Sequence, residues 1–146
     1  MVLRPDAVRE RLLKLEEIVS NLEALQPLDA QALRHGFRDA WLVERGLQVG
    51  AEVALDIGNH ILSAHFGVTA KDYEDIIGQL AVHGVIEEAL RRRLKGLGGF
   101  RNILVHGYLR IDPEAVSDHL AKAPADFAAF AAAIRNWLTM VESQGS

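Results

Sequence analysis

Apolar side chains recur every three or four positions along most of the chain, which is the period of an α-helix. The first such stripe predicts a helix over residues 5–25, closed by Pro27. After a polar connection through Asp29 and Gln31, a second stripe predicts a long helix over residues 38–65 that Gly67 ends. The apolar positions of these two helices are Val8, Leu12, Leu15, Val19, Leu22, Trp41, Leu47, Ala51, Ala54, Leu55, Ile61 and Leu62.

Three further helical regions follow. Thr69 is a suitable N-cap for a third helix, which Gly84 ends. A fourth helix is expected over residues 86–109. Asp112 as a cap and Pro113 in the first turn start the last region, in which Pro124 predicts a break.

No segment alternates apolar and polar residues over a convincing length, so no strand is predicted. Short connections favour antiparallel neighbours, and we therefore expect an all-α, antiparallel up-and-down bundle of four to five helices. At 146 residues the chain is expected to form a single domain over residues 1–146.

The composition excludes several classes of protein. The chain has no cysteine, so it has neither a disulfide framework nor a thiolate zinc site, and a reducing cytoplasm is the expected compartment. Its six histidines lack zinc-like spacing, and no metal site is expected. Charged residues interrupt the N-terminal segment, so no signal peptide is predicted, and no uncharged stretch reaches the ~20 residues of a membrane span.

One segment departs from the acidic balance of the chain. The net charge is −4, yet residues 91–110 contain six basic side chains and no acid. These six are Arg91, Arg92, Arg93, Lys95, Arg101 and Arg110. A sequence pI of about 5.8 argues against an extended nucleic-acid groove and leaves a small local site open.

The same segment ends in groups that handle phosphate. Arg101 offers a planar fork of donors, His106 changes charge near neutral pH, and the hydroxyl of Tyr108 donates, accepts or is modified. On one ideal helix Arg101 and Tyr108 share a face, whereas His106 is rotated from Arg101 by about 140°. Either the helix unwinds near Gly107 or a symmetry-related subunit supplies the second group; we favour a homodimer.

Two other features have a structural and a functional interpretation. Gly96, Gly98 and Gly99 each cost a helix about 0.8–1 kcal/mol relative to alanine, which indicates a kink or tight packing in the bundle, or else an approach surface for a second subunit or nucleic acid. A polar stripe repeats every fourth residue in the second predicted helix. It is either a solvated face or the lining of a cleft opposite the fourth helix, and it comprises Glu44, Gln48, Glu52, Asp56 and His60.

Arg101, four intervening residues, His106, one more residue and Tyr108 resemble the Arg-x4-His-x-Tyr signature of HepT-like toxins in the HEPN superfamily. The block from Phe100 to Tyr108 and the segments 44–48 and 56–60 are also similar to that family, so the resemblance covers most of the chain. Gly107 departs from it, because the family often has a larger or acidic residue there.

The resemblance implies a HEPN-like fold and a metal-independent endoribonuclease toxin of a type II toxin-antitoxin pair, which works as a homodimer and needs no cofactor. The substrate that the resemblance implies is RNA, with transfer RNA the best candidate. The implied partner is a nucleotidyltransferase antitoxin (MntA-like), expected to neutralise the toxin by AMPylation of the motif tyrosine, here Tyr108. The expected natural setting is a bacterial or archaeal cytoplasm.

The chemistry of the residues suggests a role for each. His106 acts as general base or acid, Arg101 stabilises the charge on the phosphate, and Asn102 orients the phosphate or the histidine. The run of Arg91, Arg92, Arg93 and Lys95 either binds flanking phosphates or forms a solvated face. A second hypothesis is a non-catalytic dimeric helical adaptor, or a nucleotide-binding module, for a nucleotidyltransferase.

Overall fold

The computed structural model describes residues 2–145 and is helical almost throughout. Its α-helices are α1 (Pro5–Ala24), α2 (Ala30–His35), α3 (Phe37–Phe66), α4 (Tyr73–Val82), α5 (Glu88–Leu94), α6 (Leu97–His106) and α7 (Pro113–Gln144). A short 3₁₀ turn, η1 (Tyr108–Arg110), follows α6. Residues 2–145 contain no strand, and the all-α class is confirmed.

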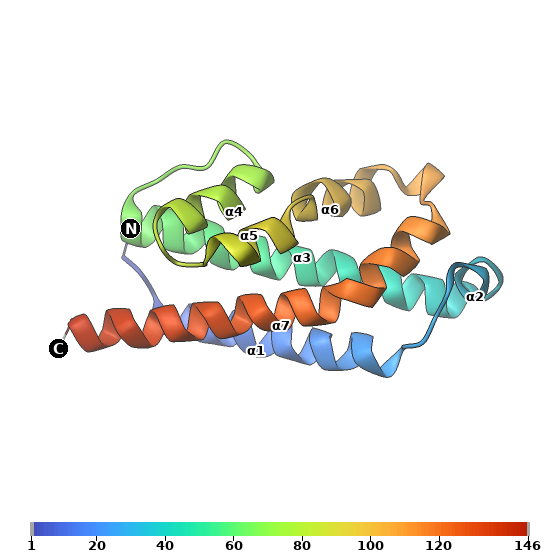
Figure 1. Ribbon diagram of the computed structural model, residues 1–146, viewed down its shortest axis with the longest axis horizontal. Coiled ribbons are helices and arrows are strands. Elements are labelled where there is room, and N and C mark those ends of the chain that lie inside the picture. Colours follow the sequence, from blue (N-terminus) through green and yellow to red (C-terminus); the bar gives the residue numbers. More distant parts are fainter. Residues whose placement is uncertain (1, 146) are drawn as a thin grey trace.

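The long helices α1, α3 and α7 form the frame of the bundle (Figure 1). α1 packs against both α3 and α7 and runs opposite to them, as an up-and-down bundle requires. The shorter helices α4, α5 and α6 cover the other side of α3 and α7. Both chain ends lie at one end of the bundle, whereas α2 and the end of α6 lie at the other (Figure 1).

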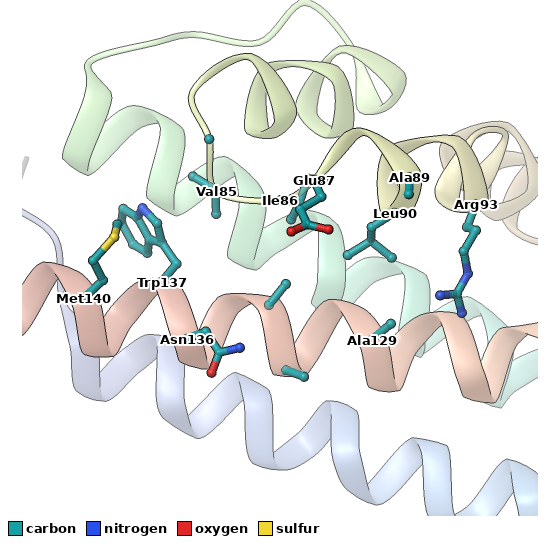
Figure 2. Close-up of a pocket in the computed structure, with 13 residues that line it drawn as sticks. Val85, Ile86, Glu87, Ala89, Leu90, Arg93, Ala129, Asn136, Trp137 and Met140 are labelled. Atoms are coloured by element: carbon teal, nitrogen blue, oxygen red, sulfur yellow. The ribbon is translucent and has the colours of Figure 1, made fainter.

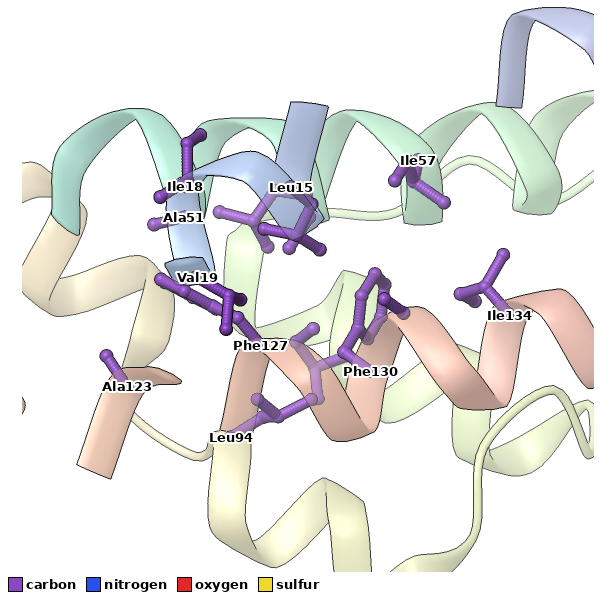
Figure 3. Close-up of a cluster of buried hydrophobic side chains, with 14 of the residues drawn as sticks. Leu15, Ile18, Val19, Ala51, Ile57, Leu94, Ala123, Phe127, Phe130 and Ile134 are labelled. Atoms are coloured by element: carbon purple, nitrogen blue, oxygen red, sulfur yellow. The ribbon is translucent and has the colours of Figure 1, made fainter. Parts of the chain in front are cut away.

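The core fills the space between the long helices. Phe127 and Phe130 of α7 are almost fully buried and point into a cluster that Leu15 of α1 also enters (Figure 3). α3 approaches this cluster closely at Gly50, where a Cβ atom would lie 2.4 Å from the ring of Phe127. The glycine therefore makes the room that the Phe127 ring occupies.

Two of the predicted helices match the structure closely. The helix expected over residues 5–25 is α1, and the one expected over residues 38–65 is α3. Gly67 ends α3 in the left-handed conformation, with φ of 65°, which glycine adopts without strain.

The connection between these helices contains an element that periodicity missed. The carboxylate of Asp29 accepts a hydrogen bond from the backbone N–H of Ala32 at 2.8 Å and starts the six-residue α2. Ala30 and Leu33 bury the apolar side of this helix. A helix of six residues is too short to show a repeating stripe.

The expected start of the third helix was wrong. Asp72, not Thr69, is the N-cap of α4, because its carboxylate accepts from the backbone N–H of Asp75 at 2.8 Å. Asp75 in turn accepts from the N–H of Lys71 at 2.9 Å. The two carboxylates together satisfy two backbone donors, those of Asp75 and Lys71, which a single threonine at position 69 does not.

The fourth helix, expected to run unbroken over residues 86–109, is divided into α5 and α6. The chain turns at Gly96, which has φ of 90°, and its N–H donates to Glu74 at 2.8 Å. α6 then ends at His106: the N–H of Gly107 makes the last α-helical bond, to the carbonyl of Ile103, and the next bond, from Arg110 to the carbonyl of Gly107, belongs to η1. Tyr108 therefore lies outside the helix that carries Arg101, so their expected position on one helix face was wrong.

Two of the three positions in the glycine cluster have a structural explanation: backbone conformation at Gly96 and packing within the bundle at Gly98. Besides the turn at Gly96, Gly98 is buried where α6 crosses α4, and a Cβ atom there would lie 2.3 Å from the Cβ of Tyr73. Gly99 faces open space.

The break expected near Pro124 does not occur, and α7 continues through it. Proline has no N–H, so the carbonyl of Leu120 loses its usual helical donor. The side-chain amide of Gln26 donates to that carbonyl instead, at 3.0 Å. The helix therefore retains a hydrogen bond at this point.

Gly98→Ala should lower the free energy of unfolding by about 1–3 kcal/mol, because the added methyl group separates α6 from α4. Gly99→Ala is the matched control and should raise it by up to about 1 kcal/mol, because alanine favours the helix and meets no neighbour. Urea denaturation of both variants measures the difference. Equal stability of the two would contradict the close contact at Gly98.

Candidate functional site

Arg101 is anchored between α6 and α3. Its Nη2 and Nε donate to the same carboxylate oxygen of Glu52, at 2.6 and 3.1 Å. The Arg101 side chain is only 18% exposed, which protects the ion pair from solvent. Arg101 is therefore paired with a carboxylate of the bundle, and this pairing fixes the direction of the guanidinium.

Two more groups hold this guanidinium. Its carbon lies 5.2 Å from the centre of the Tyr73 ring, a cation–π distance, and its Nη1 donates to the side-chain oxygen of Asn102 at 3.2 Å. Glu52, Tyr73 and Asn102 thus come from α3, α4 and α6 to position one cation.

The polar stripe of α3 faces this site in part. Glu52 reaches Arg101, as the cleft-lining interpretation expected, and Asp56 lies one turn further along. Burial raises the pKa of Asp56; the charge of Glu52 raises it further, whereas Arg11 and Arg101 lower it. The carboxylate of Asp56 therefore interacts electrostatically with two cations, Arg11 of α1 and Arg101 of α6.

His106 is the last residue of α6 and is exposed. Within residues 2–145 its ring has no hydrogen-bond or ion-pair partner, so a ligand can reach it. α6 is regular from Leu97 to His106, so the rotation of about 140° between Arg101 and His106 persists. The unwinding at Gly107 comes too late in the chain to turn His106 toward Arg101.

Tyr108 projects from η1 and is 67% exposed. It borders a hollow of about 280 Å³ that Trp41 and Glu44 of α3 also line. Burial raises the pKa of Glu44. The tyrosine hydroxyl is thus open to a modifying partner.

The basic run is more involved in ion pairs than its sequence suggested. Arg91 and Arg92 lie near Glu88, at 2.8 and 3.8 Å, and Arg93 donates to the buried Asp126 of α7 at 2.9 Å. Arg93 therefore ties α5 to α7. Arg92 in α5 and Lys95 at its end are exposed cations that precede the start of α6.

An apolar surface surrounds the motif end of the bundle. Phe37 and Trp41 at the start of α3 are 64% and 69% exposed and form an edge-to-face pair at 5.5 Å. Ile103 of α6 and Leu109 of η1 are exposed as well, at 50% and 86%. Large apolar side chains gathered in this way mark an interaction surface.

A separate hollow of about 590 Å³ lies between α7 and the segment before α5 (Figure 2). Val85, Leu90 and Trp137 line it, and no residue of segment 101–108 does. Within residues 2–145, no group of three or more His, Asp or Glu side chains is arranged to hold a metal ion. No helix in the same part of the chain is long and apolar enough to cross a membrane.

The model of the Ribonuclease HepT-like family matches residues 10–134. The chain belongs to this family. The match includes Arg101, His106 and Tyr108, and with the all-helical structure it confirms the expected HepT-like, HEPN-type identity.

Relatives of this HepT-like chain agree in length and fold. The tRNA nuclease HepT of Aphanizomenon flos-aquae is 25% identical over 143 residues, which cover 97% of each chain. The cytosolic protein YutE from Bacillus subtilis has a similar structure, with a TM-score of 0.81, 22% identity and coverage of 96% of this chain and 94% of that one. The tri-AMPylated Shewanella oneidensis HEPN toxin, solved in complex with MNT antitoxin, gives a TM-score of 0.80 at 23% identity, over 91% of this chain and 99% of that one.

Sequence reasoning missed Tyr73 as part of the site of this HepT-like protein. Tyr73 lies 28 positions before Arg101, in the third predicted helix, and nothing in its spacing links the two residues. The stripe did signal Glu52, as one of five candidates.

The titration of Asp56 tests this arrangement. Arg101→Ala should raise the pKa of Asp56, because it removes a cation that stabilises the carboxylate. Glu52→Gln should lower that pKa, because it removes a repelling charge. Carboxyl NMR titration of each variant measures the shift, and equal shifts in the same direction would contradict the proposed geometry.

Proposed function

We propose that this HepT-like protein is a metal-independent endoribonuclease toxin that cuts RNA, with transfer RNA the substrate class. The proposal depends chiefly on one observation: one short helix of a HepT-like chain carries Arg101, held by Glu52, and an exposed His106 that has no hydrogen-bond or ion-pair partner among residues 2–145. One continuous apolar core extends through all seven helices, which supports a single domain over residues 1–146.

The proposed chemistry uses the 2′-hydroxyl of RNA as the nucleophile. His106 removes its proton or donates one to the departing 5′-oxygen, while the 2′-oxygen bonds to phosphorus and the P–O5′ bond breaks. Arg101 stabilises the extra negative charge on the phosphate oxygens. Glu52 and Tyr73 keep the guanidinium in place, and Asn102 supports it through the bond to Nη1.

We propose a homodimer with a shared active site. Two observations support it: Arg101 and His106 diverge on α6, and Ile103, Leu109 and Trp41 expose apolar surface beside them. A two-fold axis near His106 would cover this surface and bring the histidine of one subunit toward the arginine of the other.

Arg101→Ala and His106→Ala should each lower RNA cleavage by about 100-fold or more, with EDTA present throughout. A re-equilibrated 1:1 mixture of the two variants should regain about a quarter of wild-type activity, because about half of its dimers are mixed and each mixed dimer re-forms one of its two sites across the two-fold axis. Cleavage of labelled RNA and light scattering measure activity and subunit number.

His35→Ala is the matched control for that experiment, because His35 is exposed and lies in α2, outside the motif. It should cut RNA as the wild type does. Full activity of the Arg101 or His106 variant would remove the ribonuclease mechanism, and wild-type protein that cuts no RNA would favour a helical adaptor instead. Complete loss with EDTA alone would contradict metal independence.

We propose further that a nucleotidyltransferase antitoxin neutralises the toxin by AMPylation of Tyr108. The phenolic oxygen attacks the α-phosphorus of ATP, its proton goes to solvent or a base, and pyrophosphate leaves. The exposure of Tyr108 supports this choice, because the other tyrosine, Tyr73, lies against the Arg101 guanidinium. An anionic AMP group beside His106 would repel RNA and block access.

Tyr108→Phe should abolish the gain of AMP mass that incubation with the antitoxin and ATP produces, whereas the control Tyr73→Phe should retain it. Intact mass spectrometry measures both. Modification that persists in Tyr108→Phe would assign the acceptor to another residue.

A further inference from the structure

A second polar pocket, of about 370 Å³, lies between the start of α1 and the later half of α3. Its polar lining combines two guanidinium groups and one carboxylate with neutral polar side chains. These residues are Arg4, Arg11, Asp56, Asn59, His60 and Ser63.

Both arginines have guanidinium N–H groups that make no hydrogen bond within residues 2–145. Arg11 uses Nη1 for the carbonyl of Ala7 at 3.0 Å, and its other guanidinium N–H groups have no hydrogen-bond partner within residues 2–145. The Arg4 guanidinium has no hydrogen-bond or ion-pair partner in that same range. Guanidinium forks of this kind fit the oxygens of a phosphate.

His60 is fixed as a neutral donor. The backbone N–H of Arg4 donates to its Nε2 at 3.2 Å, so the ring carries its proton on Nδ1. Burial lowers the pKa of His60, and the charges of Arg11 and Arg4 lower it further. The imidazole therefore adds a hydrogen-bond donor without a charge.

The pocket also contains an acid, Asp56. Asp56 interacts with Arg11 on one side and with Arg101 on the other. The formal charge of the lining, with His60 neutral, is therefore one positive charge in excess. That excess favours one anionic group and not a long polyanion bound lengthwise.

The pocket and Arg101 open on the same face of α3. Glu52, Asp56 and His60 are successive members of the stripe at four-residue spacing, so they lie along one side of α3, with a rotation of about 40° at each step. At 1.5 Å per residue, His60 lies about 12 Å along the helix from Glu52, which holds Arg101. An extended single strand of RNA spans such a distance in a few nucleotides.

We propose that Arg4, Arg11, Asn59 and His60 bind a backbone phosphate of the substrate RNA, on one flank of the bond that is cut beside Arg101. This inference rests on the proposed function. A chain of net charge −4 has no broad basic groove, so a discrete phosphate pocket supplies the attraction and the direction of the strand.

The test measures binding first, on a His106→Ala background so that the RNA stays intact. Added Arg4→Ala and Arg11→Ala substitutions should weaken binding of a single-stranded RNA about tenfold and reduce the salt dependence of log Kd by about 0.7 per lost phosphate contact. Asp56→Asn should strengthen binding, because it removes the anion from the pocket. Arg38→Ala with Lys71→Ala is the control, since both are exposed cations outside the pocket and their loss should change binding much less.

Cleavage kinetics then separate the pocket from the active site. With His106 intact, the Arg4→Ala and Arg11→Ala protein should show a raised KM and unchanged kcat on long RNA, and no change on an oligonucleotide too short to reach the pocket. If the Arg4→Ala and Arg11→Ala protein binds RNA as tightly as the control variant, or has the same KM as wild type, the pocket does not bind the RNA backbone. A third outcome also contradicts the proposal: inorganic phosphate shifts the NMR signals of His60, but the Arg4→Ala and Arg11→Ala substitutions leave the affinity for RNA unchanged.

The results that would contradict the phosphate pocket differ from those that would contradict the ribonuclease proposal. If wild-type protein cuts no RNA, yet the arginine substitutions still weaken RNA binding and Asp56→Asn strengthens it, the pocket stands and the ribonuclease proposal falls. If RNA is cut with Arg101 and His106 required but Arg4 and Arg11 irrelevant, the ribonuclease stands and the pocket falls.

Discussion

The ion pair between Arg101 and Glu52 is the constraint on which the site depends. It requires α6 to lie close on α3, and that approach is possible because Gly98 lets α6 cross α4 against Tyr73. Taking charges partly out of water is unfavourable unless the pair is well hydrogen-bonded, and here two N–H groups of Arg101 share one oxygen. Packing of small and aromatic residues thus sets the direction of a charged group.

Periodicity predicted the parts of the fold in which long helices bury one face. α1, α3 and the start of α7 at Asp112 and Pro113 followed from apolar spacing and capping residues. The shorter elements depended on individual contacts that spacing cannot show. Gly96 divides the fourth helix through its positive φ and its bond to Glu74, and the Gln26 amide keeps α7 whole at Pro124.

In the candidate site, too, the sequence identifies some residues, whereas individual contacts determine their surroundings. Arg101, His106 and Tyr108 could be selected from their chemistry and from the family resemblance, and the family is confirmed. Their surroundings come from other helices: Glu52 and Tyr73 are far from Arg101 in sequence and reach it only through the packing of α3 and α4. A stripe at four-residue spacing shows which residues share a face, but not what faces them.

α6 is only ten residues long and lies between two glycines, Gly96 and Gly107. Few buried side chains attach it to the bundle, chiefly Phe100 and Leu104, so its local opening takes less free energy than unfolding of the thirty-residue α3. The bond from Arg101 to Glu52 therefore sets more than an orientation. It also governs how often the helix that carries the motif separates from the rest of the molecule.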